Sequence, residues 1–242
     1  MTTLVLLSGG LDSAVLAAHE AQSAMVLPVY ISVGLAWEDA EVAMVERLLA
    51  SPAYAQHVEP LSRVSFTMRD VYSPAHWAIR GVPPAYDTPD EDVYLAGRNL
   101  VLLTKAGVVA SKAGAHRIAL GPLAGNPFPD ARPAFFAAMA GALSLGLDHQ
   151  IEIATPFLTW GKEDVIKRGV QLAVPFELTL SCMNPIAGDA GDAGEAGDAG
   201  EAGETGALPQ HCGLCSKCRE RRDAFAAAGV LDPSTYANKA PR

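Results

Sequence analysis

The chain has 242 residues, half of them hydrophobic, which allows one large α/β domain with a sizeable core. Its formal net charge of −9 argues against broad nucleic-acid binding, because such binding needs a basic face. The first residues lack the basic segment of a signal peptide and no apolar run reaches membrane-spanning length, so we expect a cytoplasmic protein without membrane contact.

A glycine-rich turn connects a strand expected over residues 3–7 to a helix expected over 12–23. The nucleotide-binding residues predicted here are Leu7, Ser8, Gly9, Gly10, Leu11, Asp12 and Ser13. A helix N-terminus offers free N–H groups to a phosphate, and glycine lets the backbone approach it closely. Ser8 and Ser13 add hydroxyl donors, while Asp12 can cap the helix or help to hold Mg²⁺.

Two common phosphate motifs do not fit this turn. A P-loop needs a lysine at its end, and the dinucleotide fingerprint needs a third glycine where the chain has Ser13. The remaining pattern, Ser-Gly-Gly-x-Asp-Ser, resembles the PP-loop of ATP pyrophosphatases, which cleave ATP between its α- and β-phosphates. The alternative is an ordinary glycine-rich turn between strand and helix.

Strands and helices then alternate along the chain. Strands are expected over 25–32, more weakly within 52–65, and over 117–121 and 151–156; helices are expected over 38–51, 98–111, 132–146 and 162–172. A long loop is expected over 70–96. Pro28 lies inside an otherwise apolar strand and predicts a bulge or an irregular edge.

This alternation predicts a doubly wound parallel sheet, with ligands bound at the carboxyl ends of its strands. The loops that leave those ends are 8–13, 32–37, 121–132 and 156–162. We therefore expect the glycine-rich turn, the 121–132 loop and Lys162 to surround one crevice. Lys162 is the candidate cation for the phosphates, unless it is a solvent-exposed lysine at a helix start.

A run of glycine, acidic residue and alanine extends from Gly188 to Thr205 and predicts a flexible surface insertion. It divides the expected organisation into a pyrophosphatase-like domain over 1–180, a metal-binding region over 181–228 interrupted at 188–206, and a tail over 229–242.

All four cysteines of the chain lie in the second of these regions. They are Cys182, Cys212, Cys215 and Cys218. Four thiolates at such short spacing match a closed tetrahedral Zn²⁺ site, which is usually structural; an iron–sulfur cluster and a redox dithiol are the alternatives. The site would attach a helix expected over 216–228 to the segment near residue 180. The flanking basic residues are expected to offset the metal–thiolate charge and to face solvent: Lys217, Arg219, Arg221 and Arg222. The alternative for them is a direct role at the phosphates, which their spacing does not support.

Together these motifs resemble the 7-cyano-7-deazaguanine synthase family, also called QueC or ExsB. Further matching segments are Gly97-Arg98-Asn99-Leu100, Phe128-Pro129-Asp130-Ala131-Arg132, Ser144-Leu145-Gly146 and Thr155-Pro156 with Lys162. The chain departs from the family pattern where Leu35, Ala36 and Trp37 replace Gln-Arg-His, at 121–126, and at Ala131, where the family has cysteine. The segments expected to bind and activate the nucleotide therefore match the family pattern, whereas those expected to bind the acceptor are altered.

The resemblance implies an enzyme that converts 7-carboxy-7-deazaguanine and ammonia to the 7-cyano compound with ATP, Mg²⁺ and a structural Zn²⁺, and it implies a homodimer. Ser8, Asp12, Ser13 and Lys162 would act on the phosphates.

The other polar candidates belong to the nucleotide and the acceptor. Arg98 and Asn99 would hold nucleotide or acceptor, or only cap their helix. Asp130 and Arg132 would bind the acceptor, or form a loop ion pair or a cap. Trp37 and Trp160 would stack on a base or belong to the core.

Two rival interpretations remain. The enzyme could adenylate a different carboxylate or a base, or the chain could be a non-catalytic, zinc-clipped nucleotide-binding module.

Overall fold

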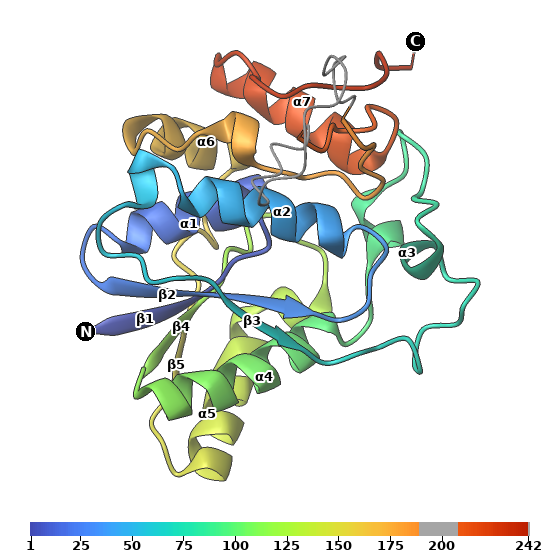
Figure 1. Cartoon of the computed structure of the whole chain (residues 1–242). Helices are drawn as coiled ribbons and strands as arrows, with labels where there is room; N and C mark the ends of the chain where they lie inside the picture. Colours follow the sequence, from blue (N-terminus) through green and yellow to red (C-terminus); the bar gives the residue numbers. More distant parts are fainter. Residues whose placement is uncertain (189–207, 242) are drawn as a thin grey trace, which may run out of the picture.

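The computed structural model describes residues 1–188 and 208–241 (Figure 1). Apart from Gly188, the insertion predicted over 188–206 lies outside the described residues. No helix within the described ranges combines the length and the hydropathy that crossing a bilayer requires.

A five-stranded parallel sheet forms the centre of the molecule, in the order β3-β2-β1-β4-β5. The strands are β1 (Thr2–Leu6), β2 (Met25–Ser32), β3 (Ser62–Ser65), β4 (Arg117–Ala119) and β5 (Glu152–Ala154). This arrangement confirms the predicted doubly wound sheet. The switch in strand order lies at β1, the strand that leads into the glycine-rich turn.

Helices cover both faces of the sheet (Figure 1). One face carries α1 (Leu11–Glu20), α2 (Glu38–Leu49) and α6 (Lys162–Gln171), with α7 (Ser216–Ala228) packed against α6; the other carries α4 (Arg98–Ala113) and α5 (Pro133–Leu147). Strand β1 alternates between two cores, because Leu4 belongs to the α4 side and Val5 to the α1 side, both fully buried. Burial on both faces explains why its sequence is continuously apolar.

Pro28 interrupts the ladder between β2 and β3. Val26 pairs with Val58 and Val29 pairs with Ser62, so three steps on β2 face four steps on the partner segment. The extra residue is a bulge, and it lies where the missing N–H of Pro28 would otherwise be needed. The predicted bulge is thus confirmed.

The predicted loop over 70–96 is wrong in part, because it contains a short helix, α3 (Trp77–Arg80), and a 3₁₀ turn over Asp90–Val93. Tyr72, Val93 and Leu95 are buried in the α4-side core. Apolar side chains therefore hold this segment against the carboxyl edge of the sheet, although its proline-rich sequence has little regular structure.

Candidate active site

The glycine-rich turn adopts the conformation that a phosphate cradle needs. Gly10 is the extended N-cap residue of α1, and Gly9 has φ of +78°, in the left-handed region that glycine tolerates. A Cβ on Gly9 would lie 2.9 Å from Val45 Cγ2 and 3.2 Å from the Glu41 carbonyl oxygen. Close packing against α2 thus requires glycine at this position.

The two serines brace the turn from within. The Ser8 N–H donates to Ser13 Oγ at 3.3 Å, and Ser13 Oγ donates to the Gly10 carbonyl oxygen at 3.0 Å. These bonds hold the first turn of α1 so that its leading N–H groups face outward, where the helix dipole favours an anion. The serines therefore order the loop in addition to offering hydroxyls.

A cavity of about 500 Å³ opens in front of this turn. Of the predicted site residues, it is lined by Leu7, Ser8, Gly10, Leu11, Asp12, Ser13, Arg98, Asn99, Asp130 and Lys162. Cys182 also reaches its wall. Residues far apart in the sequence thus meet at the carboxyl edge of the sheet, as is usual for this topology.

Lys162 begins α6 and points at the glycine-rich turn. Its Nζ lies 3.2 Å from Asp12 Oδ2 and also contacts the carboxylate of Glu220, a residue that the sequence interpretation missed. Burial alone would lower the pKa of Lys162, but Asp12 and Glu220 outweigh burial and hold the pKa above its ordinary value. Lys162 is therefore a fixed positive charge beside the loop.

Only one of the two carboxylate oxygens of Asp12 has a partner in the structure. Its Oδ2 faces Lys162, whereas Oδ1 is buried and has no hydrogen-bond partner. Burial raises the pKa of Asp12, and Lys162 acts in the opposite direction. A buried carboxylate oxygen without a donor is suited to a hard cation such as Mg²⁺.

The predicted acceptor residues separate into two groups. Asp130 is buried, its Oδ2 accepts from the Asn99 N–H at 3.2 Å, and Asn99 Nδ2 donates to the Asp130 carbonyl oxygen at 2.9 Å. This pair fixes the start of α4 and leaves the neighbouring Arg98 at the cavity wall, with a buried Nε that has no partner. Arg132 is exposed and lies outside the cavity lining.

A buried carboxyl that sequence reasoning missed, Glu41, also lines the cavity. Tyr30 Oη donates to Glu41 Oε2 at 2.8 Å. Burial raises the pKa of Glu41 to about 7, and the nearby Arg98 charge acts against that rise. The sequence did not reveal Glu41, because it lies in the first turn of α2 with other acidic residues, and such residues are expected to face solvent.

The two tryptophans differ in position. Trp37 lines the cavity and stacks on Trp77, with ring centroids 5.8 Å apart and planes 11° from parallel. Trp160 packs against Phe157 and His19 beside the α1-side core and does not reach the cavity lining.

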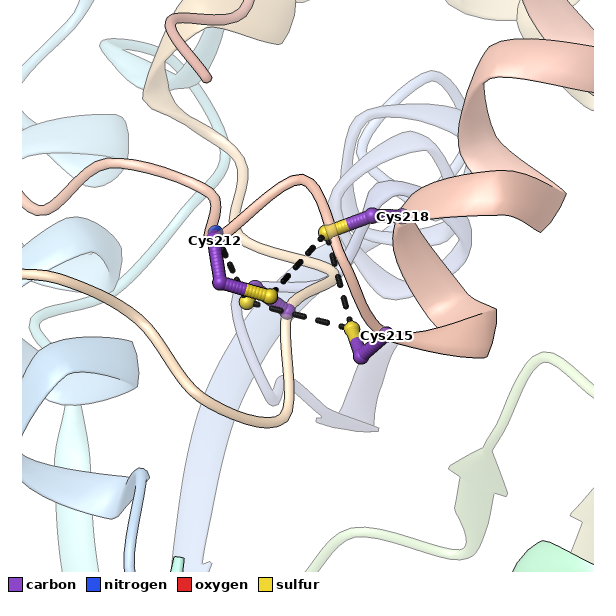
Figure 2. A group of neighbouring side chains, drawn as sticks. Cys212, Cys215 and Cys218 are labelled. Atoms are coloured by element: carbon purple, nitrogen blue, oxygen red, sulfur yellow. Dashed lines mark hydrogen bonds between the residues drawn. The ribbon is translucent and has the colours of Figure 1, made fainter. Parts of the chain in front are cut away.

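The four cysteines converge on one point (Figure 2). All four sulfur atoms lie within 4.8 Å of one another, all four side chains are buried, and none forms a disulfide. The sulfur–sulfur distances are 4.0 Å for Cys182–Cys215, 3.9 Å for Cys212–Cys218 and 3.5 Å for Cys215–Cys218. Tetrahedral zinc with bonds of about 2.3 Å places its sulfurs about 3.8 Å apart, so the cluster fits a metal ion.

Backbone N–H groups point at these sulfurs, as they do toward thiolates. Asn184 and Cys212 donate to Cys182 Sγ at 3.3 and 3.2 Å, and Gly213 donates to Cys218 Sγ at 3.4 Å. Such bonds stabilise negative charge on sulfur in a buried site.

Arg221 corrects the expectation that the basic residues around the cysteines face solvent. Its side chain is 1% exposed, and its guanidinium donates to Thr179 Oγ1 at 2.8 Å and to the Phe176 carbonyl oxygen at 3.0 Å. It also pairs with Asp232 at 3.3 Å. Arg221 thus fastens α7 to the segment before Cys182, next to the cysteine cluster.

Comparison with known proteins agrees with the motifs. Residues 2–229 match the family model described as queuosine biosynthesis protein QueC. A 7-cyano-7-deazaguanine synthase of Anaeromyxobacter dehalogenans is 32% identical over 97% of this chain and 95% of its own. Proteins of the same name from Azoarcus sp. and Methanothrix thermoacetophila are 34% and 30% identical, each over 96% of both chains. On this match, which covers nearly the whole chain, the protein belongs to the QueC family.

Proposed function

We propose that this protein is a 7-cyano-7-deazaguanine synthase, which uses ATP and ammonia to convert a 7-carboxy-7-deazaguanine to the nitrile. The observation that carries the proposal is the Lys162–Asp12 pair facing the glycine-rich turn in one cavity, within a chain that matches synthases of that name over nearly its whole length.

The first half-reaction makes the acid reactive. A carboxylate oxygen of the substrate attacks the α-phosphorus of ATP, the bond to the β-phosphate oxygen breaks, and an acyl-adenylate and pyrophosphate result. Lys162 and the N–H groups at the start of α1 would stabilise the charge that develops on the departing pyrophosphate. Ser8 and Ser13 would hold the loop in shape for that group.

The second half forms the nitrile. Ammonia attacks the acyl carbon, AMP leaves with the carboxylate oxygen, and an amide remains. A second ATP adenylates the amide oxygen, and loss of that oxygen as AMP, with loss of protons from nitrogen, leaves the C≡N bond. Both adenylations need the same alignment, so one cavity can serve both.

Arg98 is the candidate anchor for the acid group. Its unpartnered Nε at the cavity wall suits a carboxylate acceptor. Asp130 would act through Asn99 and α4 by fixing the place of Arg98. Arg132 is exposed and lies outside the cavity lining, so no contact in the structure supports a role at the acceptor, and that role stays a prediction.

Two metals have suitable ligands. Asp12 Oδ1 would take part in holding Mg²⁺, which neutralises phosphate charge. The four cysteines would hold a structural Zn²⁺ that stabilises the attachment of α7. A cytoplasmic location and a homodimer are part of the same proposal, and the homodimer rests on the resemblance alone.

Exchange of labelled pyrophosphate into ATP tests the first half-reaction by itself. The proposal predicts exchange that requires 7-carboxy-7-deazaguanine and does not require ammonia. Exchange that another carboxylate or base supports, and this acid does not, would favour a different acceptor. The replacement of Gln-Arg-His by Leu35, Ala36 and Trp37 motivates that second candidate. Absence of exchange with every acceptor would favour a non-catalytic nucleotide-binding module.

A further inference from the structure

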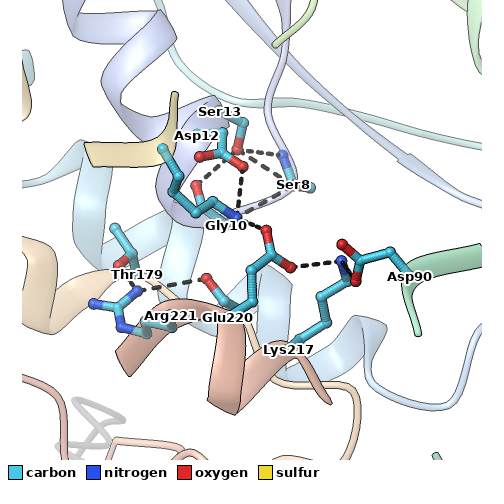
Figure 3. Close-up of polar contacts among 11 residues, drawn as sticks. Ser8, Gly10, Asp12, Ser13, Asp90, Thr179, Lys217, Glu220 and Arg221 are labelled. Atoms are coloured by element: carbon cyan, nitrogen blue, oxygen red, sulfur yellow. Dashed lines mark hydrogen bonds and ion pairs between the residues drawn. The ribbon is translucent and has the colours of Figure 1, made fainter. Parts of the chain in front are cut away.

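Glu220 holds two lysines at once. Its Oε1 contacts Lys162 Nζ, and its Oε2 lies 2.6 Å from Lys217 Nζ. The row continues at both ends, because Lys162 also pairs with Asp12, and Lys217 lies 3.5 Å from Asp90 Oδ1 (Figure 3). Five charges of alternating sign thus run from the glycine-rich turn across α6 and α7 to the 3₁₀ turn at residue 90.

All five groups line the cavity in front of the glycine-rich turn. Three are acidic and two are basic, so the row as it stands has an excess of negative charge. Both lysines of this row are paired with carboxylates, so neither is an unpaired cation for a polyphosphate that enters the cavity. A polyphosphate that binds these lysines therefore competes with the carboxylates for the two ammonium groups.

Glu220 is the partner that can be exchanged most readily. A carboxylate that presents each of its oxygens to a different ammonium has the same pattern of acceptors as a phosphate group. Its side chain is 27% exposed and comes from α7, so it can rotate away without disturbing the glycine-rich turn. Asp12, in contrast, belongs to α1 and stays beside Lys162.

We propose that Lys217 is a second polyphosphate-binding residue and that Glu220 is an internal anion which occupies both lysines until ATP displaces it. The inference rests on the proposed function, since it assigns further residues to the same ATP site. Lys217 and Lys162 would then bind the β- and γ-phosphates from two helices. On release of pyrophosphate, Glu220 returns to the lysines and helps to expel the product.

The position of Lys217 also connects the metal centre to the nucleotide. Lys217 lies between Cys215 and Cys218, at the first turn of α7. The cysteine cluster therefore determines where the Lys217 backbone lies relative to the glycine-rich turn. Lys217 acts on the phosphates only while the cluster holds this end of the helix in place.

Binding of magnesium pyrophosphate and of AMP to the full-length protein, measured by calorimetry, tests the proposal. Lys217→Ala should weaken pyrophosphate binding by about tenfold, the loss expected for one charge-assisted hydrogen bond. AMP binding should not change, because AMP has no β- or γ-phosphate. Glu220→Gln should tighten pyrophosphate binding, because it removes the competing charge and keeps the side-chain shape.

Lys167→Ala is the matched control, because Lys167 is an exposed lysine of α6 outside the cavity lining. Lys217→Arg keeps the charge and should retain most of the pyrophosphate affinity, which separates loss of charge from loss of folding. Equal pyrophosphate affinity in Lys217→Ala and Lys167→Ala overturns the proposal, as does equal weakening of AMP and pyrophosphate binding. A wild-type protein that binds neither ATP nor pyrophosphate overturns the proposed function as well.

Discussion

The ammonium group of Lys162 lies 3.2 Å from the Asp12 carboxylate, and this contact joins the start of α6 to the start of α1. Two helices that are far apart in the sequence thus direct opposite charges at the same point. One charge is suited to phosphate oxygens and the other to a cation. The pair thus places in front of the glycine-rich turn the two charges that the proposed adenylation needs.

Lys162→Met should nearly abolish adenylation. We expect the rate of acid-dependent pyrophosphate exchange to fall by about 10²- to 10³-fold, the usual effect of removing one group that stabilises transition-state charge. Lys167→Met, a change on the exposed face of the same helix, should leave the rate unaltered. A Lys162→Met enzyme with wild-type exchange would exclude Lys162 from the phosphate site.

Gly9→Ala should damage the loop more than its backbone strain alone predicts. An alanine at positive φ costs about 1–2 kcal/mol, and Gly114→Ala measures this cost in isolation because a Cβ there meets nothing within 4 Å. At Gly9 the added carbon also meets Val45 at 2.9 Å. Urea unfolding should show the larger loss of stability for Gly9→Ala, and only this variant should lose pyrophosphate exchange. Equal effects of the two substitutions would contradict the close packing of the turn on α2.

Glu41 should make the protein less stable as pH rises from about 4.5 to 7. Its folded-state pKa is raised to about 7 from an ordinary value of 4.5, so between these values the native state binds more protons than the unfolded state. The free energy of unfolding therefore decreases with pH in this window, by roughly 1–3 kcal/mol. Glu41→Gln should remove this slope from urea titrations, whereas Glu46→Gln, at an exposed position, should keep it. An unchanged slope in Glu41→Gln would show that Glu41 titrates normally.

The cysteine cluster should contain one zinc ion per chain, and its removal should unfold the α7 region. Metal analysis of protein purified without chelator checks the content. Cys215→Ser and chelation should both lower the melting temperature, and added zinc should restore the chelated protein only. A visible absorption band from iron and sulfide would indicate a cluster in place of zinc, and a metal-free protein with an unchanged melting temperature would contradict a metal site.

Local spacing was enough to predict the glycine-rich turn and the cysteine cluster. Gly9 and Gly10 directly precede a helix, and three of the cysteines recur at every third residue, so neighbouring positions specify the turn and three of the four sulfur atoms. The fourth, Cys182, lies 30 residues before Cys212. The doubly wound parallel sheet followed from the alternation of apolar strands and helices, whereas its strand order came only from the structure. The irregular pairing at Pro28 followed from the fact that proline cannot donate to a ladder.

Long-range packing determined what the sequence did not reveal. Glu41, Glu220 and Arg221 are charged residues of helices, and a helix with charges is normally expected to expose them. Each of the three contacts a partner on another element or far away along the chain. The partners are Tyr30 for Glu41, Lys162 for Glu220 and Thr179 for Arg221. Pair contacts of this kind depend on how helices rotate against the sheet, which no local pattern specifies.

The most direct measurement of the central claim follows the products of one reaction mixture by mass spectrometry. Purified protein is incubated with ATP, Mg²⁺, ammonium and 7-carboxy-7-deazaguanine. The proposed function predicts the 7-cyano product and two molecules of AMP for each nitrile, with Asp12→Ala producing neither. Protein that folds, binds ATP and yet forms no nitrile and no AMP from this acid would contradict it.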